Sequence, residues 1–287
     1  MRSELDKNKI ETGLYIVSTP IGNLKDITLR AIDVLKKSDY IFCEDTRIAK
    51  KLLNHYGIKS KLISNYKFNE KKNLEKYKEI ILGNNIISLI SDAGTPLISD
   101  PGKYLLDECI KNKIKITPIP GVSSVTTAIS ISNFSNNFFF QGFLPDKLSQ
   151  VEKQFLTLSN FECSIVFFVS SKKLNKIVNL LKVYFKGRKI VFCKELTKFY
   201  EELIRYDIDN LKNFDTNLKG EITVVVSEKQ NFKNKSKFLS ESDKIIINKL
   251  IKNTSVKNIV KILNDKNKVS KSKIYEYCVK IKNKNFN

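Results

Sequence analysis

The sequence predicts an α/β protein with a mostly parallel sheet first, a mixed sheet second and a small helical module last. From residue 13 to about residue 131, short apolar and β-branched runs alternate with helical patterns, a spacing typical of parallel strands joined by helices. After residue 138, strand patterns follow one another with less helix between them, which is typical of a mixed sheet. The last fifth of the chain has helical periodicity and a concentration of lysine.

The first domain is predicted over residues 13–132, after a polar and mobile lead-in at residues 1–12. Its strands are expected at 13–20, 40–43, 62–63, 86–90 and 114–119. Its helices are expected at 26–37, 46–55, 69–82, 104–111 and 122–131. Asp26 is placed to cap the first helix, and the last helix is small and rich in Ser and Thr, so other backbone can approach it closely.

The second domain is predicted over residues 133–230, beginning with a polar linker at 133–137. Its first segment is 138–145, FFFQGFLP; its strands are expected at 165–169, 189–193, 200–206 and 222–226, and its helices at 147–159 and 172–185.

The third module, residues 240–287, is predicted to hold short helices at 243–253, 255–264 and 271–281, with Ser255 and Ser270 as caps. Two helices joined by a short turn, with Lys271, Lys273 and Lys280 exposed, are typical of a helix-turn-helix. A small helical cap with a solvated basic face is the alternative. A tail that binds nucleic acid loosely through phosphates would fit both interpretations.

Composition narrows the function classes. The chain has 287 residues, 41% of them hydrophobic, but no apolar run long enough to span a membrane and no apolar stretch near the N-terminus that would form a secretory signal. Five scattered cysteines without a CxxC pair indicate a reduced, cytoplasmic setting. His55 is the only histidine, which excludes histidine-based zinc sites; it is expected at the end of a helix, and no metal is predicted.

The formal net charge of +21 is typical of proteins that bind nucleic acid or an anionic surface. Only five of the 51 basic residues are arginine, and such a lysine excess can also come from coding bias. The distribution is more informative, because residues 229–287 hold sixteen lysines against four acidic residues.

Residues 86–102, IISLISDAGTPLISDPG, carry the strongest local signal for a binding site. A buried strand, Ile86 to Ile90, runs into a loop rich in Gly and Pro with two carboxylates, Asp92 and Asp100. In open α/β sheets ligands bind beyond the carboxyl ends of the strands. The loop has no Lys, Arg or Gly-x-Gly for a phosphate, so it suits a positively charged ligand such as S-adenosylmethionine. An ordinary strand–turn–helix connection is the alternative.

Seven motifs identify a family. In order, the chain contains GLYIVSTPIGNLKDITLRAIDVL, CEDTR, SDAGTPLISDPG, PIPGVSSVTTAI, GFLP, KELTKFYEE and KGEITVVV. Over roughly residues 13–228 the chain resembles the tetrapyrrole methylase superfamily, and within it the ribosomal RNA small subunit methyltransferase I family. The resemblance implies S-adenosylmethionine in the cleft between two α/β domains and a homodimer. It also implies 2′-O-methylation of a cytidine (cytidine 1402) in the decoding region of 16S rRNA, within the small ribosomal subunit.

Carried over by position, the resemblance implies a cofactor site made from both domains. The first-domain contacts would be Pro20, Ser91, Asp92, Ala93, Gly94, Pro96, Ile98, Asp100, Gly121, Val122, Ser123 and Ser124. The second-domain wall would be Phe168, Val169 and Ser170 with Glu221, Ile222 and Thr223. The chain departs from the family pattern here, because the family usually has an acidic residue in place of Val169 and His-Arg in place of Lys172-Lys173. The turn Pro120-Gly121-Val122 is closer to the tetrapyrrole-modifying members.

Methyl transfer from a sulfonium to a ribose hydroxyl needs an in-line nucleophile and help in removing its proton, and no metal. Asp45 and Arg47, after Glu44 in CEDTR, are predicted to handle substrate, and Lys194 or Glu195 to manage the proton or charge. The alternatives are a helix N-cap for the first group and a surface ion pair for the second.

Two other functions remain open at this point. A tetrapyrrole C-methyltransferase would need neither residues 240–287 nor CEDTR. A nucleic-acid-binding protein with a degenerate methylase core would transfer no methyl group.

Overall fold

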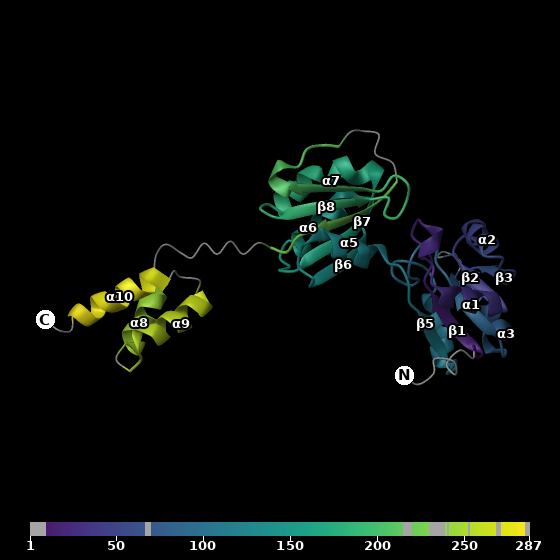
Figure 1. Ribbon diagram of the computed structural model, residues 1–287, viewed down its shortest axis with the longest axis horizontal. Coiled ribbons are helices and arrows are strands. Elements are labelled where there is room, and N and C mark those ends of the chain that lie inside the picture. The colour runs from purple at the N-terminus through teal and green to yellow at the C-terminus, as the bar shows by residue number, and fades with distance from the viewer. Residues whose placement is uncertain are drawn as a thin grey trace. The chain divides into compact units, whose positions relative to one another are not determined.

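The computed structural model (Figure 1) describes residues 10–66, 70–214, 220–229, 239, 241–251, 253–267 and 271–284. The chain forms two compact units, residues 1–229 and 230–287, which are described separately.

The first sheet is entirely parallel, as the alternation of strands and helices predicts. Its strands are β1 (Gly13–Val17), β2 (Tyr40–Cys43), β3 (Lys61–Ser64), β4 (Ile86–Leu89) and β5 (Ile116–Ile119). They lie in the order β3-β2-β4-β1-β5, so β1 pairs with both β4 and β5. The carboxyl ends of these three neighbouring strands therefore meet at one edge, which is where the sequence predicts a ligand.

Helices cover both faces of this sheet because successive strand residues point to opposite sides. Tyr15 and Val17 pack with α1 (Leu29–Lys37) and α2 (Thr46–His55). Leu14 packs on the other face with α3 (Glu70–Leu82) and α4 (Lys103–Lys111). Figure 1 shows α1, α2 and α3 beside the strands of this sheet.

The predicted start of the first helix is wrong. Asp26 ends a short 3₁₀ turn (Leu24–Asp26), Ile27 is extended, and α1 begins only after Thr28. Thr28 is the cap, since its Oγ1 accepts a hydrogen bond from the N–H of Ala31 at 3.1 Å. His55 is the last residue of α2, as predicted.

Most of the lead-in, residues 1–9, lies outside the described residues. At its end, Glu11 pairs with Lys115 at 2.6 Å.

The second sheet is mixed, as predicted. Its strands are β6 (Phe138–Phe143), β7 (Ser164–Ser170), β8 (Lys189–Lys194), β9 (Glu202–Asp207) and β10 (Glu221–Val226), in the order β6-β7-β10-β8-β9. β6 and β7 are parallel, and the other pairs are antiparallel. The helices α6 (Leu148–Leu158) and α7 (Ser171–Tyr184) and the 3₁₀ turn Ile208–Asn210 cover one face (Figure 1).

The opposite face of the second sheet is covered by α5 (Ser124–Ser132), a helix that the sequence assigns to the first domain. Val125 and Ala128 of this helix are buried against Val166, Val191 and Val225. The small residues of α5 allow this close packing, and the helix links the carboxyl edge of the first sheet to the face of the second.

The second unit contains α8 (Glu241–Leu250), α9 (Val256–Asn267) and α10 (Lys271–Lys284) around a small core of Ile247, Ile259, Leu263, Ile274 and Cys278. Ser255 caps α9 as predicted, since its Oγ accepts a hydrogen bond from the N–H of Asn258 at 3.3 Å. The predicted cap Ser270 and the rest of the turn, residues 268–270, lie outside the described residues. Within the described ranges, no helix combines the length and apolarity that a membrane span requires.

Candidate active site

A cavity of about 280 Å³ opens at the carboxyl edge of the first sheet and extends to the second sheet. Residues from both sheets and from the turn after β8 line it: Ile21, Asp92, Ala93, Gly94, Thr95, Ile98, Asp100, Ser123, Ser124, Val125, Phe143, Phe168, Val169, Ser170, Cys193, Leu196, Lys198, Gly220, Glu221, Ile222 and Thr223. The carboxylates Asp92 and Asp100 lie on the first-sheet side, and Lys198 and Glu221 lie on the second-sheet side.

The loop after β4 is bound to the ends of the neighbouring strands. Thr19, just beyond β1, and Gly94 exchange two main-chain hydrogen bonds, of 2.9 and 3.0 Å. Thr95 Oγ1 donates to the carbonyl of Val122, beyond β5, at 3.1 Å and lies 3.1 Å from Ser18 Oγ. The loop after β4 is thereby fixed to the ends of both β1 and β5.

The backbone of this loop is strained at several residues. Leu97 and Ser99 have φ values of 70° and 78°, in the left-handed region that side chains other than Gly rarely adopt. Gly102 is required at φ 127°, because a Cβ atom there would lie 2.5 Å from Leu89 Cδ2. Strain of this kind persists only where surrounding contacts impose it, and it is frequent at ligand-binding loops.

The two carboxylates of the loop are poised for a cation. Burial, together with the negative charges of Glu44 and Asp92, raises the pKa of Asp100 to about 7. Burial also raises the pKa of Asp92, although its Oδ1 accepts a hydrogen bond from the N–H of Asp45 at 3.1 Å. Within the described residues neither carboxylate forms an ion pair. A ligand that carries a sulfonium or an ammonium fits this donor set. No cluster of metal-ligating side chains occurs in the described ranges.

The wall from the second sheet follows from its register. β10 begins where β7 ends, so Glu221 and Ile222 lie opposite Ser170 and Val169. Phe168, Val169 and Ile222 present a mostly apolar surface that excludes water from one side of the cavity.

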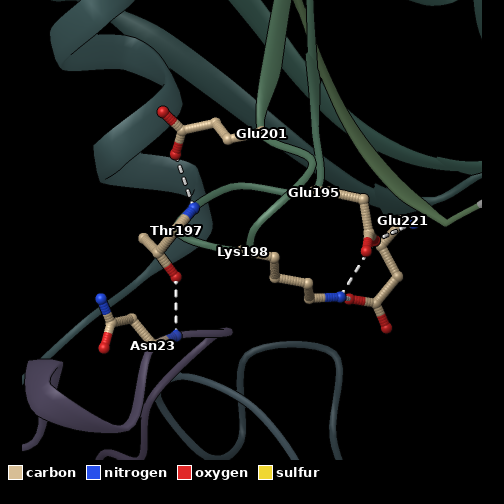
Figure 2. A network of polar contacts seen from close by, with 6 residues as sticks. All are labelled: Asn23, Glu195, Thr197, Lys198, Glu201 and Glu221. Atoms are coloured by element: carbon tan, nitrogen blue, oxygen red, sulfur yellow. Dashed lines mark hydrogen bonds and ion pairs between the residues drawn. The ribbon is translucent and has the colours of Figure 1, made fainter.

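The turn after β8 completes the lining and is held by a polar network (Figure 2). Thr197 Oγ1 accepts a hydrogen bond from the N–H of Asn23 at 3.0 Å, and the N–H of Thr197 donates to Glu201 at 2.6 Å. Glu195 and Thr197 have φ values of 50° and 65°, so two more side-chain-bearing residues are strained here. Leu196 and Lys198, between and after them, face the cavity.

Lys198 Nζ lies 3.0 Å from carboxylate oxygens of both Glu195 and Glu221 (Figure 2). Burial lowers the pKa of Lys198, but the two carboxylates outweigh it and raise the pKa above its ordinary value. Burial likewise raises the pKa of Glu195, and hydrogen bonds from the N–H of Glu221 and from Lys198 more than offset that effect and lower it. Glu195 and Lys198 therefore both stay ionised at neutral pH.

Thirteen of the eighteen residues predicted for the cofactor site line this cavity: Asp92, Ala93, Gly94, Ile98, Asp100, Ser123, Ser124, Phe168, Val169, Ser170, Glu221, Ile222 and Thr223. The other five are Pro20, Ser91, Pro96, Gly121 and Val122, which do not line it. Ser91 is buried and its Oγ donates to the carbonyl of Gly94 at 3.2 Å, so it shapes the loop. Gly121 is needed for close approach, since a Cβ atom would lie 2.8 Å from Ser18 Cβ.

The four predicted catalytic residues are not in the lining. Asp45 is the N-cap of α2, as the alternative interpretation proposes, and accepts the N–H of Arg47 at 2.8 Å. The Arg47 side chain is 87% exposed and binds both oxygens of Asp45, which holds the pKa of Asp45 at about 2. The Asp45 N–H contact to Asp92 nevertheless ties this helix start to the cofactor loop.

Lys194 and Glu195 do not pair with each other, so the alternative interpretation of an ion pair between them does not hold. Lys194 pairs with Glu202 at 3.1 Å and Glu195 with Lys198. Their roles in proton or charge management stay predictions.

Eight lining residues are not predicted from the sequence: Ile21, Thr95, Val125, Phe143, Cys193, Leu196, Lys198 and Gly220. The motifs GFLP and KELTKFYEE contain Phe143, Leu196 and Lys198, so the signal was present without a role attached to it.

Comparisons with known proteins agree with this geometry. The sequence model of the family Tetrapyrrole (Corrin/Porphyrin) Methylases matches residues 13–212. The crystal structure of the methyltransferase CobJ shares the fold, with a TM-score of 0.56 and 12% identity over 76% of this chain and 94% of that one.

Curated relatives are much more similar in sequence. Ribosomal RNA small subunit methyltransferase I of Rickettsia prowazekii (strain Madrid E) is 43% identical over 278 residues, which cover 95% of this chain and 98% of that protein. The protein of the same name from Mesomycoplasma conjunctivae is 42% identical over 219 residues, covering 76% of this chain and 92% of its own. The chain therefore belongs to the ribosomal RNA small subunit methyltransferase I family, within the tetrapyrrole (corrin/porphyrin) methylases.

Proposed function

We propose that this protein uses S-adenosylmethionine to methylate the ribose 2′-hydroxyl of a cytidine, cytidine 1402, in the decoding region of 16S rRNA. One observation carries the proposal. Two half-buried carboxylates without an ion-pair partner among the described residues, Asp92 and Asp100, stand on a strained loop at the edge of a parallel sheet, facing an apolar wall. The names of the curated relatives support RNA as the substrate class.

The bound donor would supply a methyl group already activated on a positively charged sulfur. The residues of this chain bind and orient it. Asp100 and Asp92 accept hydrogen bonds from its ammonium and hydroxyl groups and balance its charge, and the wall of Phe168, Val169 and Ile222 excludes water. Such positioning accounts for most of the rate enhancement that a transfer without covalent catalysis needs.

Lys198 is the cation among the described lining residues, and its raised pKa keeps it protonated. A fixed ammonium stabilises the negative charge that develops on a ribose oxygen as its proton leaves. We retain as hypotheses the substrate-handling role of Asp45 and Arg47 and the role of Lys194 or Glu195 in proton or charge management.

The partners are proposed on the same basis. The small ribosomal subunit supplies the RNA, the cytoplasm is the compartment, and a homodimer is the expected assembly. The lysine-rich residues 229–287 support an additional electrostatic contact to RNA phosphates.

Radiolabelled donor tests the function directly. The protein is incubated in separate reactions with three acceptors: small subunits, naked small-subunit RNA and a uroporphyrinoid. The subunits and the RNA both lack the modification. We expect label in the RNA. After alkaline hydrolysis the label should remain in a dinucleotide, because a 2′-O-methyl group blocks cleavage of the adjacent phosphodiester. Label in the uroporphyrinoid would contradict RNA as the substrate. Absence of transfer to any acceptor would contradict the proposed methyltransferase activity.

A further inference from the structure

We propose that Phe143 is a stacking platform for a base of the RNA substrate, and that the lysines beside it bind the adjoining phosphates. This inference rests on the proposed function and adds a substrate subsite to it. Phe143 lines the cavity and is nonetheless 64% exposed. A large aromatic side chain that is both exposed and part of a cavity lining is accessible to a ligand that enters the cavity.

The ring packs against Phe168, which a third ring supports in turn. Its centroid lies 4.9 Å from that of Phe168, and the ring of Phe140 packs on Phe168 at 5.0 Å. Phe168 and Phe140 themselves pack into the core beneath α5. Phe143 is therefore supported on one side, and its remaining surface is free for a planar ligand.

A β-bulge places the ring there. The register of β6 against β7 shifts between Phe140 and Gly142, and Gly142 adopts a φ of 80°. Without the extra residue, alternation would turn Phe143 away from the face that carries Phe140 and Phe168. The bulge turns it back to that face, opposite Phe168. Bulges that re-aim a side chain beside a site are typical functional features.

The surface beside Phe143 is basic. Lys173 Nζ donates to the carbonyl of Leu144, the next residue, at 3.4 Å and pairs with Asp146. Lys147 follows Phe143 by four residues and Lys172 precedes Lys173; both are exposed, and in the described residues neither has an ion-pair partner. Three lysines against one aspartate complement the phosphates of a strand of RNA. A second copy of this equally basic surface would be repelled.

An aromatic ring flanked by lysines is the usual arrangement for single-stranded RNA, because every base has a face that can stack while the phosphates supply the charge. The adenine of the methyl donor is the other nucleobase that could reach the ring. The open face and the neighbouring lysines favour the RNA base, since the donor carries no phosphate.

The full-length protein and an unmodified transcript of the decoding region test the subsite. Phe143→Ala should weaken RNA binding, measured by fluorescence anisotropy, about tenfold. Phe143→Trp should retain RNA binding, whereas Phe143→Leu should behave like the alanine variant. The affinity for S-adenosylmethionine, measured by calorimetry, should stay unchanged in all three. Phe138→Ala, at the other end of β6, is the aromatic control.

Transcripts with a single abasic nucleotide at successive positions locate the base. At one position, the losses of binding free energy caused by removing the base and by removing the ring should not be additive, because both changes abolish the same contact. Lys172→Gln should reduce the slope of log affinity against log salt by about 0.7, the value for one phosphate contact on single-stranded RNA. Lys186→Gln, an exposed lysine beyond the other end of α7, is the control and should leave the slope unchanged.

The outcomes distinguish a failure of the Phe143 subsite from a failure of the proposed function. If wild-type protein methylates RNA but Phe143→Ala behaves like Phe138→Ala, the subsite is wrong and the proposed function stands. If Phe143→Ala weakens donor binding and leaves RNA binding unchanged, the ring belongs to the adenine and the subsite is again wrong. If wild-type protein labels no RNA, the proposed function itself fails.

Discussion

The main-chain N–H of Asn23 donates a 3.0 Å hydrogen bond to the Oγ1 of Thr197, a residue 174 positions later in the chain (Figure 2). Thr197 has a φ of 65°, which is unfavourable for a β-branched residue. The contact joins the loop after β1 to the turn after β8, and the neighbours of Thr197, Leu196 and Lys198, line the cavity. Thr197, a strained residue that accepts a hydrogen bond from a distant part of the chain, thus fixes one wall of the site.

Replacing Thr197 separates its hydrogen bond from its strain. Thr197→Val keeps the branched side chain in the left-handed region but removes the acceptor, so the free energy of unfolding should fall by about 1 kcal/mol. Thr197→Gly removes the same acceptor but relieves a strain of about 1–2 kcal/mol, so it should be closer to wild type. Urea denaturation measures both. Equal destabilisation would mean that the φ of Thr197 carries no strain.

Gly22 lies against the same turn. A Cβ atom on Gly22 would approach Lys198 Cγ to 2.4 Å, Thr197 Oγ1 to 2.8 Å and the carbonyl of Leu196 to 2.9 Å. Gly22→Ala should therefore displace the turn and weaken binding of S-adenosylmethionine about tenfold, within the range expected of overpacking. Gly57→Ala is the matched control, because Gly57 has a φ of 65° but open space around it. It should lower stability without changing the affinity.

The sequence predicts the strands and helices well because each one carries its own periodicity. The Asp92–Asp100 loop is also predictable, since its composition and its place after a buried strand are local facts. The cap at Thr28 is missed because Asp26 is an equally good capping residue, and only the extended backbone at Ile27 decides between them.

The rest of the site depends on contacts between distant segments. Lys198 becomes a lining residue only because Glu195 and Glu221 hold it, and the turn reaches the cavity only through Asn23. Phe143 faces the cavity only because of a bulge, and a glycine within a strand pattern hints at a bulge without fixing which way the next ring points. No local pattern contains such information.

Asp100 should make donor binding dependent on pH. Its pKa is about 7 in the free protein, because burial and the charges of Glu44 and Asp92 disfavour ionisation. A cationic ligand prefers the carboxylate, so affinity should rise between pH 6 and pH 8. Asp100→Asn should bind more weakly and lose this component of the pH dependence, measured by calorimetry. Titration of the ligand itself affects both proteins equally, so it cancels when the affinity of the variant is compared with that of the wild type at each pH. Parallel pH curves would contradict this role.

Asp100 should also make folding stability depend on pH, but its contribution to stability should fall as pH rises, whereas its contribution to donor binding should rise. The pKa of Asp100 is raised from 3.8 to about 7 on folding, so between these values the native state binds more protons than the unfolded state. The contribution of Asp100 to the free energy of unfolding therefore falls as pH rises from about 4 to about 7. Asp100→Asn should be more stable relative to wild type at pH 8 than at pH 4, in denaturation curves without ligand. A constant difference across this range would mean that Asp100 titrates normally.

Removing residues 230–287 should separate RNA affinity from donor binding. These residues form a unit with its own core, and Lys271, Lys273 and Lys280 are exposed on α10. The sequence model of the methylase family matches residues 13–212, all of which remain, so the remaining chain should still bind the donor. If the three lysines contact phosphates, the salt slope of RNA binding should fall by about 2 on truncation. The full-length variant with Lys271→Gln and Lys280→Gln should lose part of that slope without loss of the unit. An unchanged slope in both proteins would leave the unit with a structural role alone.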